Sequence, residues 1–267
     1  MVSRYAVMGN PVQHSLSPII HQLFAEQTGC QLQYDKIQID LDSFEQQVRD
    51  FFNAGGQGLN ITLPCKQRAF AMCDKVTDRC LQARAANTLW QKAGKLHADN
   101  TDGIGLLRDL RRHMDLSGKR ILLLGAGGAA RGILGPLLDA LPAKLTIANR
   151  TLTTALELQD DFKQRPYVSN MDELTPEYDL IINATSASFG GTFLELPAHV
   201  IGHAALCYDL SYGTSEATPF VDKARRLGCF ALDGLGMLIE QAAEAFFIWH
   251  GVMPIARDVL AKIEKNP

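Results

Sequence analysis

The sequence lacks the long apolar segments that mark membrane-spanning and secreted proteins. Its most suggestive apolar run, residues 121–130, is rich in glycine and alanine and lies between Arg120 and Arg131. A membrane-spanning helix needs about 20 apolar residues, so no span is predicted. The opening Met-Val-Ser-Arg-Tyr has no apolar core followed by a small-residue cleavage site, which argues against a secretory signal.

An excess of charge of one sign is also missing. The 26 lysines and arginines face 29 aspartates and glutamates, for a net charge of -3 at pH 7, and no long basic run occurs. A strongly basic surface is what nucleic acid and anionic membranes attract. The charge balance therefore argues against either as the main partner.

Patterns that mark metal sites or disulfide frameworks are absent as well. No two cysteines form a C-x-x-C pair, and their spacing fits no zinc site; they lie at positions 30, 65, 73, 80, 207 and 229. His199 and His203 are spaced to share a helix face, but no third ligand is nearby, so no metal site is predicted. Free thiols favour a reducing compartment, and we expect a cytoplasmic protein.

What the sequence does contain is the composition of an ordinary globular protein. Its 267 residues are 46% apolar and 21% charged, which excludes global disorder. At roughly 150 residues per domain this length indicates about two domains, although a single α/β barrel can also be this long.

Strand-like and helix-like stretches alternate along the chain, which is typical of an α/β fold. Near the start, Ser17-Pro18 favours the beginning of a helix, with Ser17 as its candidate cap. Phe44, Val48 and Phe51 recur at helical spacing, and another helix is expected to run to about Cys73. Strands are expected over residues 4–8, 34–39, 59–62, 86–91 and 95–98, the last two as a hairpin.

The character of the sequence changes near Thr101, where we place a domain boundary. Residues 121–124 are apolar on both faces, as in a central parallel strand, and further strands are expected over 145–148, 180–184 and 206–210. Helical stretches between strands, and another over 219–228, make this a βαβ series. The last two expected helices, residues 237–250 and 254–263, could belong to either domain on periodicity alone.

A glycine-rich turn directly follows the 121–124 strand and opens a helix. Residues 125–130 read Gly-Ala-Gly-Gly-Ala-Ala, which fits the dinucleotide-binding pattern G-x-G-x-x-A. Gly125 permits the tight turn, Gly127 lets a pyrophosphate approach the backbone, and Ala130 keeps the helix close to the strand. The helix N-terminus offers free N–H groups to the anion.

The end of the next expected strand indicates which dinucleotide binds. NAD sites usually carry an acidic residue there for the ribose 2′-hydroxyl, whereas this chain has Asn149-Arg150-Thr151. An arginine can clamp a 2′-phosphate, so NADP is the predicted cofactor. The alternative is that Arg150 is only a solvated surface charge.

Four short polar motifs in the first part of the chain lie at expected strand ends or turns. They are His14-Ser15-Leu16-Ser17-Pro18, Asn60-Ile61-Thr62-Leu63-Pro64-Cys65-Lys66, Ala86-Asn87-Thr88 and Asn100-Thr101-Asp102-Gly103. Taken singly, each has an ordinary explanation as a cap, a turn or a surface charge. Spacing alone does not show that they converge.

As a set, these motifs carry a resemblance. They are followed in order by the glycine-rich turn with Arg131, by Asn149-Arg150-Thr151, by Asn183-Ala184-Thr185-Ser186, by Asp209-x-x-Tyr212 and by Asp233-Gly234-x-Gly236-Met237-Leu238-x-x-Gln241-Ala242. From about Gly9 to past His250 the chain resembles the shikimate dehydrogenase family. The resemblance implies reversible NADPH-dependent reduction of 3-dehydroshikimate to shikimate, in the pathway to chorismate and the aromatic amino acids.

The resemblance also implies two α/β domains. Residues 1–101 with 237–267 would form the substrate domain, and residues 102–236 a Rossmann-type, doubly wound NADP-binding domain. The expected partner is the small-molecule substrate, with no nucleic acid and no membrane, and the expected assembly is a monomer or homodimer.

Site residues follow from the resemblance position by position. Lys66 and Asp102 would be the catalytic pair, with Lys66 as principal acid and base. Substrate contacts would come from Ser15 and Ser17 at the carboxylate and from Asn60, Thr62, Lys66, Asn87, Asp102, Tyr212 and Gln241 around the ring. Cofactor contacts would come from Gly125, Ala126, Gly127, Gly128, Ala129, Asn149, Arg150, Thr151, Asn183, Thr185, Ser186, Leu210, Gly234, Met237 and Leu238.

Two departures from the family pattern and two rival functions stay open. Many members carry a second basic residue where this chain has Thr154, and the stretch 187–191 differs in its glycine positions. One rival is a quinate/shikimate dehydrogenase with relaxed NAD and NADP use, against which Arg150 argues. The other is a regulator that binds metabolite and nucleotide without turnover, against which Lys66 and Asp102 argue.

Overall fold

A computed structural model describes residues 2–162, 165–175, 178–185, 196, 198–202, 204–213 and 216–265. The chain divides into two compact units, which are described separately. Unit 1 comprises Met1–Leu106 and Leu238–Asn266, and unit 2 is Leu107–Met237. Both divisions fall inside continuous helices, α5 (Asp102–Leu110) and α10 (Leu235–His250), rather than at the turns that the sequence marks.

Unit 1 is built on a six-stranded mixed sheet in the order β2-β1-β3-β5-β6-β4. Strand β1 is parallel to β2 and β3, β5 is antiparallel to β3 and β6, and β4 is parallel to β6. The strands are β1 (Ser3–Gly9), β2 (Leu32–Gln38), β3 (Gly56–Ile61), β4 (Lys75–Val76), β5 (Thr88–Lys92) and β6 (Lys95–Asp99). The β5–β6 hairpin turns at Ala93 and Gly94, both with positive φ, which matches the tight hairpin turn expected there.

The helices of unit 1 are α1 (Ser17–Thr28), α2 (Phe44–Asn53), α3 (Lys66–Ala71), α4 (Asp78–Ala83), α11 (Ala256–Lys265), the first turns of α5 and most of α10, with a 3-10 turn at Leu41–Ser43. Three of them, α1, α3 and α5, begin within the polar motifs, and the short helix α4 is one that the sequence did not predict. The prediction that Ser17 caps α1 is wrong. Ser17 is the first helical residue, and its backbone N–H donates to the Ser15 hydroxyl, so Ser15 satisfies that free donor instead.

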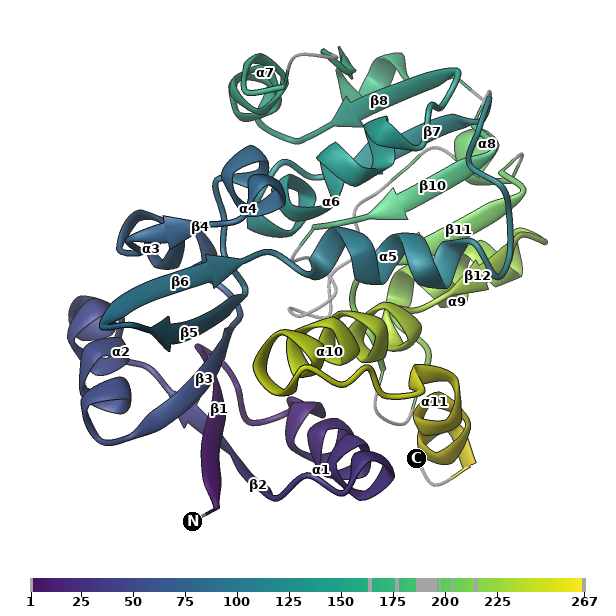
Figure 1. Cartoon of the computed structure of the whole chain (residues 1–267). Helices are drawn as coiled ribbons and strands as arrows, with labels where there is room; N and C mark the ends of the chain where they lie inside the picture. Colours follow the sequence, from purple (N-terminus) through teal and green to yellow (C-terminus); the bar gives the residue numbers. More distant parts are fainter. Residues whose placement is uncertain are drawn as a thin grey trace. The chain divides into compact units, whose positions relative to one another are not determined.

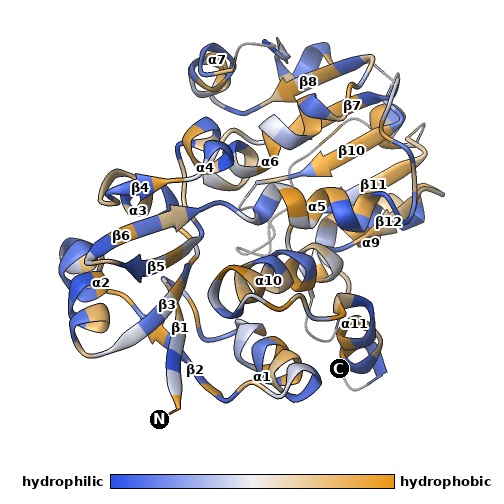
Figure 2. Ribbon diagram, in the orientation of Figure 1, coloured by the Kyte–Doolittle hydropathy of each residue, from blue (hydrophilic) through white to orange (hydrophobic). Residues whose placement is uncertain are grey.

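The core of unit 1 combines aliphatic residues of the sheet with aromatic residues of the helices. The stripe of Phe44, Val48 and Phe51 is buried against the sheet, as its spacing predicts. A second cluster joins α1 to α10: the His21 ring lies near those of Phe24, Phe246 and Trp249. The long helix α10 carries many apolar residues between polar ones, and Figure 2 shows it as a mixture of orange, pale and blue segments.

Unit 2 contains a six-stranded parallel sheet in the order β12-β11-β10-β7-β8-β9 (Figure 1). The strands are β7 (Arg120–Leu124), β8 (Lys144–Ala148), β9 (Tyr167–Ser169), β10 (Leu180–Asn183), β11 (Leu206–Asp209) and β12 (Phe230–Leu232). Numbered from β7, the order read from the β9 edge is 3-2-1-4-5-6, the arrangement of the Rossmann fold. The helices are α6 (Gly128–Asp139), α7 (Leu152–Asp160), α8 (Ala198–Ile201) and α9 (Pro219–Arg226), with a 3-10 turn at Met171–Glu173.

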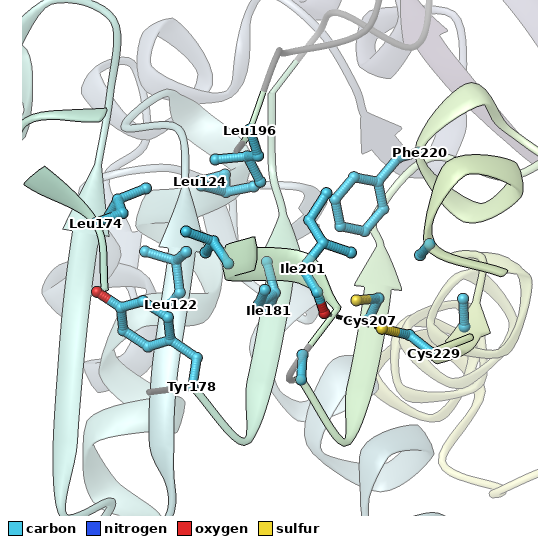
Figure 3. Packing of buried hydrophobic residues seen from close by; sticks show 14 of the residues in the cluster. Leu122, Leu124, Leu174, Tyr178, Ile181, Leu196, Ile201, Cys207, Phe220 and Cys229 are labelled. Atoms are coloured by element: carbon cyan, nitrogen blue, oxygen red, sulfur yellow. Dashed lines mark hydrogen bonds between the residues drawn. The ribbon is translucent and has the colours of Figure 1, made fainter. Parts of the chain in front are cut away.

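The sheet of unit 2 positions several strand ends at one edge. Leu124 of β7 lies opposite Ala148 of β8 and Asn183 of β10, and Asn183 lies opposite Asp209 of β11. Apolar side chains of these strands, such as Leu122 and Ile181, form the core together with helix residues such as Phe220 of α9 (Figure 3). The register therefore brings the motifs that follow β7, β8, β10 and β11 to the carboxyl edge of one sheet.

The six cysteines are all free thiols, and most of them are buried. Cys229 donates a hydrogen bond to the Ile201 carbonyl at 2.8 Å within the core of unit 2 (Figure 3). No helix in the described part of the chain combines the length and the apolar character that a bilayer span requires.

Candidate active site

The predicted catalytic pair is formed in unit 1. Lys66 is the first residue of α3 and Asp102 the first residue of α5, and Lys66 Nζ lies 2.6 Å from Asp102 Oδ2. The two side chains are only 13% and 6% exposed. A pair withdrawn from water to this degree survives only when hydrogen bonds satisfy its remaining polar atoms.

Asn87 supplies those hydrogen bonds. Its Nδ2 group donates to Asp102 Oδ1 and to the Thr101 hydroxyl, both at 2.9 Å, and lies 3.2 Å from Gln241 Oε1. Its Oδ1 atom accepts from the Thr101 backbone N–H and the Thr88 hydroxyl, both at 2.9 Å. The network therefore fixes the Asp102 carboxylate while leaving the second lone pair of each oxygen available.

Gln241 reaches the same network from α10. Its Oε1 atom faces Asn87 Nδ2 and the Thr101 hydroxyl, and its Nε2 group donates to the Leu238 carbonyl at 2.9 Å. One N–H of that amide is then left for a ligand. Asn87 and Gln241, which are 154 positions apart in the sequence, thus converge in one fold unit.

Asn60 lies at the far side of this network. Its Nδ2 group donates to the Asn87 carbonyl at 3.1 Å and to the Thr88 hydroxyl at 3.2 Å. Pairing of β3 with β5 places Asn60 opposite Thr88, which explains why the two motifs meet. Hydrogen bonds therefore connect five of the predicted residues, Asn60, Lys66, Asn87, Asp102 and Gln241, directly or through a neighbour.

The remaining predicted residues of unit 1 lie at the margin of that network. The Ser15 hydroxyl donates to the Ser17 hydroxyl at 3.1 Å, so the two expected carboxylate contacts form a pair of their own. Tyr34 connects this pair to Asn60, because its hydroxyl bonds with both Ser17 and Asn60. Thr62 follows β3 and is half-buried, and a side chain at Gly9 would come within 2.2 Å of its methyl carbon.

Sequence reasoning missed a second buried charge cluster beside the site. Asp99 is 3% exposed and accepts from Arg79 Nε at 2.7 Å and from the Thr77 hydroxyl, and Arg79 also contacts Glu244 at 3.0 Å. These contacts tie α4, the end of β6 and α10 together just before Asp102 and one turn beyond Gln241. No local pattern signals them, because the partners lie 20 and 165 positions apart.

The glycine-rich turn of unit 2 has the geometry that a phosphate requires. Gly125 has φ of +101°, and a Cβ there would meet the Ala184 carbonyl oxygen at 3.0 Å, so only glycine fits without strain. A Cβ at Gly127 would meet nothing within 4 Å, and no side chain caps the α6 N-terminus that follows. Free N–H groups of Gly128 and Ala129 therefore lie next to an open backbone, which suits a pyrophosphate.

The turn after β8 suits a 2′-phosphorylated ribose. Arg150 is exposed, and the neighbouring Asn149 side chain donates to the Thr151 carbonyl at 2.9 Å, which holds the turn. The strand end, Asn149-Arg150-Thr151, carries no acidic residue. A guanidinium here offers charge and paired donors to a phosphate group, whereas a carboxylate would repel it. The residues present therefore fit NADP.

Asn183 and Thr185, two predicted cofactor contacts, are engaged with each other and with Asp209. Asn183 is 3% exposed, donates to Asp209 Oδ1 at 3.1 Å and accepts from the Thr185 hydroxyl at 2.7 Å. Asp209 also accepts from the Thr218 hydroxyl at 2.6 Å. Asn183 therefore shapes the end of β10 from within the fold. The third predicted residue of this motif, Ser186, lies outside the described residues, as do positions 187–191.

Gly234 and the first turn of α10 pack closely against neighbouring residues of unit 2. Gly234 packs on the Leu210 carbonyl, 2.2 Å from where its Cβ would be, and a Cβ at Gly236 would lie 2.3 Å from the Asp109 carboxylate. The buried Tyr208 hydroxyl donates to Asp109 at 2.7 Å and accepts from the Met237 N–H at 3.2 Å. Leu238, also predicted to contact the cofactor, falls in unit 1, and Tyr212 is a half-buried residue of unit 2.

Metal ligation has no support in the described residues. Among them, no group of three or more histidines, cysteines, aspartates or glutamates is arranged to hold a metal ion. Of the spaced pair noted in the sequence, His199 belongs to α8 and His203 lies outside the described part.

Together these features define a class of protein. A Rossmann-type sheet with a dinucleotide-binding turn and an arginine at the ribose position, accompanied by a unit with a buried lysine–aspartate pair, is typical of nicotinamide-dependent α/β oxidoreductases. Three sequence-family matches narrow this class. They are "Shikimate dehydrogenase substrate binding domain" over residues 7–89, "Shikimate / quinate 5-dehydrogenase" over 109–189 and "Shikimate 5'-dehydrogenase C-terminal domain" over 234–261.

Individual relatives agree with these matches. The NADP(+) shikimate dehydrogenase of Legionella pneumophila (strain Lens) is 56% identical over 98% of this chain and 99% of its own. That of Alkalilimnicola ehrlichii is 47% identical over 98% and 99%. The crystal structure of shikimate 5-dehydrogenase from Thermus thermophilus with NADP(H) and shikimate has a TM-score of 0.89, at 31% identity over 99% of each chain. The chain belongs to the shikimate dehydrogenase family.

Proposed function

We propose that this protein catalyses the reversible NADPH-dependent reduction of 3-dehydroshikimate to shikimate, a step towards chorismate and the aromatic amino acids. The observation that carries the proposal is the Lys66–Asp102 pair, 2.6 Å apart and held by Asn87. Relatives named NADP(+) shikimate dehydrogenases align over nearly the whole chain, and one related structure holds both NADP(H) and shikimate.

Proton transfer is the task of Lys66. When bound, the nicotinamide supplies the hydride, and the carbonyl oxygen must then gain a proton. Lys66 Nζ, as an ammonium, has three N–H groups, of which one is directed to Asp102 Oδ2. Another donates to the carbonyl oxygen, and in the reverse direction the neutral amine takes the proton from the hydroxyl.

Asp102 anchors both the lysine and the substrate. Asn87 holds its Oδ1 atom at 2.9 Å, which fixes the carboxylate plane, and each oxygen keeps one lone pair for a substrate hydroxyl. Because the site combines several neutral polar groups with a lysine, it suits a small, hydroxylated acid. An analogue that lacks a hydroxyl would leave protein groups unpaired, so discrimination is strong.

The other contacts are assigned by family membership. We propose that Ser15 and Ser17 hold the substrate carboxylate and that Asn60, Thr62, Asn87, Tyr212 and Gln241 surround the ring. We propose that the α6 N-terminus binds the pyrophosphate and that Arg150, with Asn149 and Thr151, binds the ribose phosphate. Asn183, Thr185, Ser186, Leu210, Gly234, Met237 and Leu238 would shape the nicotinamide position.

Replacement of Lys66 tests the proposed function. We expect Lys66→Ala to lower kcat by about 10²–10⁴-fold with little change in the KM for shikimate, because a proton-transfer group is lost. The absorbance of NADPH formed from shikimate gives the rate. Lys92→Ala, which removes an exposed lysine of the β5–β6 hairpin, is the matched control and should keep the wild-type kcat and KM. Near-normal turnover by Lys66→Ala would reject the assignment.

Substrate and cofactor choice separate the rival functions. Shikimate and quinate are each supplied with NADP⁺ and with NAD⁺. Turnover of shikimate with NADP⁺ but not with NAD⁺ supports the proposal. Turnover of quinate with NAD⁺ identifies the relaxed-specificity enzyme. Binding of shikimate without any turnover identifies a regulator.

The cysteines bear on the cellular location of the protein. Free thiols at all six cysteines suit a reducing compartment, and we propose a cytoplasmic monomer or homodimer. Light scattering on the purified protein with and without NADPH determines the assembly.

A further inference from the structure

Tyr34 of β2 contacts Asn60, one of the residues proposed to bind the substrate. Its hydroxyl donates to Asn60 Oδ1 at 2.7 Å, although 26 residues separate the two in sequence. Burial raises the pKa of Tyr34 well above 10, and a hydrogen bond with Ser17 opposes that rise only in part. The phenol therefore stays protonated, and so a donor, throughout the working pH range.

The orientation of the Asn60 amide is determined by its partners. The Asn87 carbonyl can only accept, so the Asn60 atom facing it at 3.1 Å must be the Nδ2 group. The second N–H of that group goes to the Thr88 hydroxyl at 3.2 Å. Asn60 Oδ1 then faces Tyr34, and Asn60 has no N–H group left for a ligand.

We propose that Tyr34 is a positioning residue for substrate specificity: its hydroxyl bonds to Asn60 Oδ1 and steadies an amide that can offer a ligand only this oxygen, so that Asn60 recognises a ring hydroxyl as a donor. This inference rests on the proposed function, since it concerns the same site. A ligand that carries a keto or ether oxygen at that place would set two acceptors against each other, and a deoxy ligand would leave Oδ1 without its partner.

A stack of rings keeps the phenol in place. The Tyr34 ring lies 4.3 Å from the His21 ring with an interplanar angle of 11°, and the Trp249 ring lies 6.5 Å away. His21 is fully buried. Burial, with a smaller contribution from His250, lowers the pKa of His21 to about 3, although Asn60 acts in the opposite direction. A neutral imidazole is thus the surface on which Tyr34 stacks, so α1 and α10 jointly fix the phenol.

The test combines one protein change with one ligand change. Tyr34→Phe removes a single oxygen and keeps the stacked ring. Initial rates are measured with shikimate and with its 4-deoxy and 5-deoxy analogues, neither of which alters the reacting carbon. We expect Tyr34→Phe to lower kcat/KM for shikimate about tenfold, mainly through KM, and to change kcat less than threefold. One of the two analogues lacks the hydroxyl that Asn60 Oδ1 would contact. For that analogue Tyr34→Phe should lower kcat/KM less than twofold, because the contact that the substitution weakens is already missing.

A matched control lies in the same aromatic cluster. Tyr5 packs against Trp249 with ring centroids 4.9 Å apart, and its hydroxyl bonds with Ser3 rather than with Asn60. Tyr5→Phe should leave kcat/KM unchanged for shikimate and for both deoxy analogues. Thermal unfolding with and without saturating shikimate shows whether each variant is folded and binds the ligand.

The outcomes separate this inference from the proposed function. Equal losses for shikimate and both analogues, or no loss at all, would overturn the positioning role while the enzyme assignment stands. Wild-type protein that does not oxidise shikimate would overturn the proposed function and this inference with it. A loss confined to kcat would also contradict the role, since Tyr34 does not touch the reacting atoms.

Discussion

At the residue scale, the exposed guanidinium of Arg150 is the group that we propose determines cofactor choice. It lies at the end of β8, and Thr154, three positions after Thr151, adds no second basic side chain to this turn. A charged hydrogen bond of this kind contributes roughly 1.5–3 kcal/mol, and 1.4 kcal/mol corresponds to about tenfold. We expect Arg150→Ala to lower kcat/KM for NADPH about 10- to 100-fold and to leave NADH almost unaffected.

Parallel kinetics with the two reduced cofactors check this prediction. Arg226→Ala removes another exposed arginine of unit 2, at the end of α9, and should change neither value. Equal losses with NADPH and NADH would mean that Arg150 does not contact the 2′-phosphate.

The buried imidazole of His21 should make stability depend on pH. Burial, chiefly, lowers its pKa from 6.5 to about 3. Between these values the unfolded chain binds a proton that the folded protein does not, so the free energy of unfolding falls as the pH falls. His21 contributes at most about 1.4 kcal/mol per pH unit to this slope. His21→Phe keeps a flat ring but cannot titrate, and should flatten the slope.

Urea unfolding at several pH values between about 4.5 and 7.5 measures that slope. His113→Gln, at an exposed histidine of unit 2, is the control and should keep the wild-type dependence. An unchanged slope in His21→Phe would show that other groups dominate acid unfolding.

At the scale of elements, the β7–α6 turn separates two roles that glycine can have. Gly125 has positive φ and a carbonyl 3.0 Å from any added Cβ, so Gly125→Ala should cost on the order of 1–3 kcal/mol of stability. Gly127 has open space around it, so Gly127→Ala should leave the Tm unchanged. It should nonetheless raise the KM for NADPH at least tenfold, because a methyl group would occupy the position of the pyrophosphate.

Thermal unfolding without cofactor and NADPH kinetics distinguish the two variants. Each glycine variant is the control of the other. If Gly127→Ala binds NADPH normally, the cofactor does not approach the backbone at this turn.

Elements with a strong internal pattern were predictable from the sequence, and the elements missed are short. The fully apolar run of β7 and the helical stripe of α2 were placed within a residue or two. Strands β4, β9 and β12 were not foreseen. They have two or three residues each and lie at sheet edges, where neither two-sided burial nor alternation leaves a signal.

The site was predictable in its members but not in its connections. Lys66, Asn87 and Asp102 were named by resemblance, yet only the register of β3, β5 and β6 explains why they meet. The contacts of Arg79 with Asp99 and Glu244, and of Tyr34 with Asn60, join positions 20 to 165 residues apart. Such pairs depend on tertiary structure, about which local spacing carries no information.

At the scale of the whole molecule, two separate units predict two separate ligand footprints. NADPH should slow amide exchange at the start of α6 in unit 2, and shikimate should slow it around Asn60 and Lys66 in unit 1. Hydrogen exchange followed by mass spectrometry, with each ligand added alone, measures both. The β5–β6 hairpin tip at Ala93 serves as an internal reference that neither ligand should protect. Protection of the α6 start by shikimate alone would contradict the assignment of ligands to units.

The chain leaves unit 1 within α5 and returns within α10, so residues 107–237 form one uninterrupted insert. The segment that we propose binds the dinucleotide is therefore continuous and bordered by Leu106 and Leu238, whereas Lys66 and Asp102 belong to the other unit. We expect exchange of residues 107–237 for the matching segment of a relative to change the cofactor preference while Lys66 and Asp102 stay in place, and to affect acid recognition only through Tyr212.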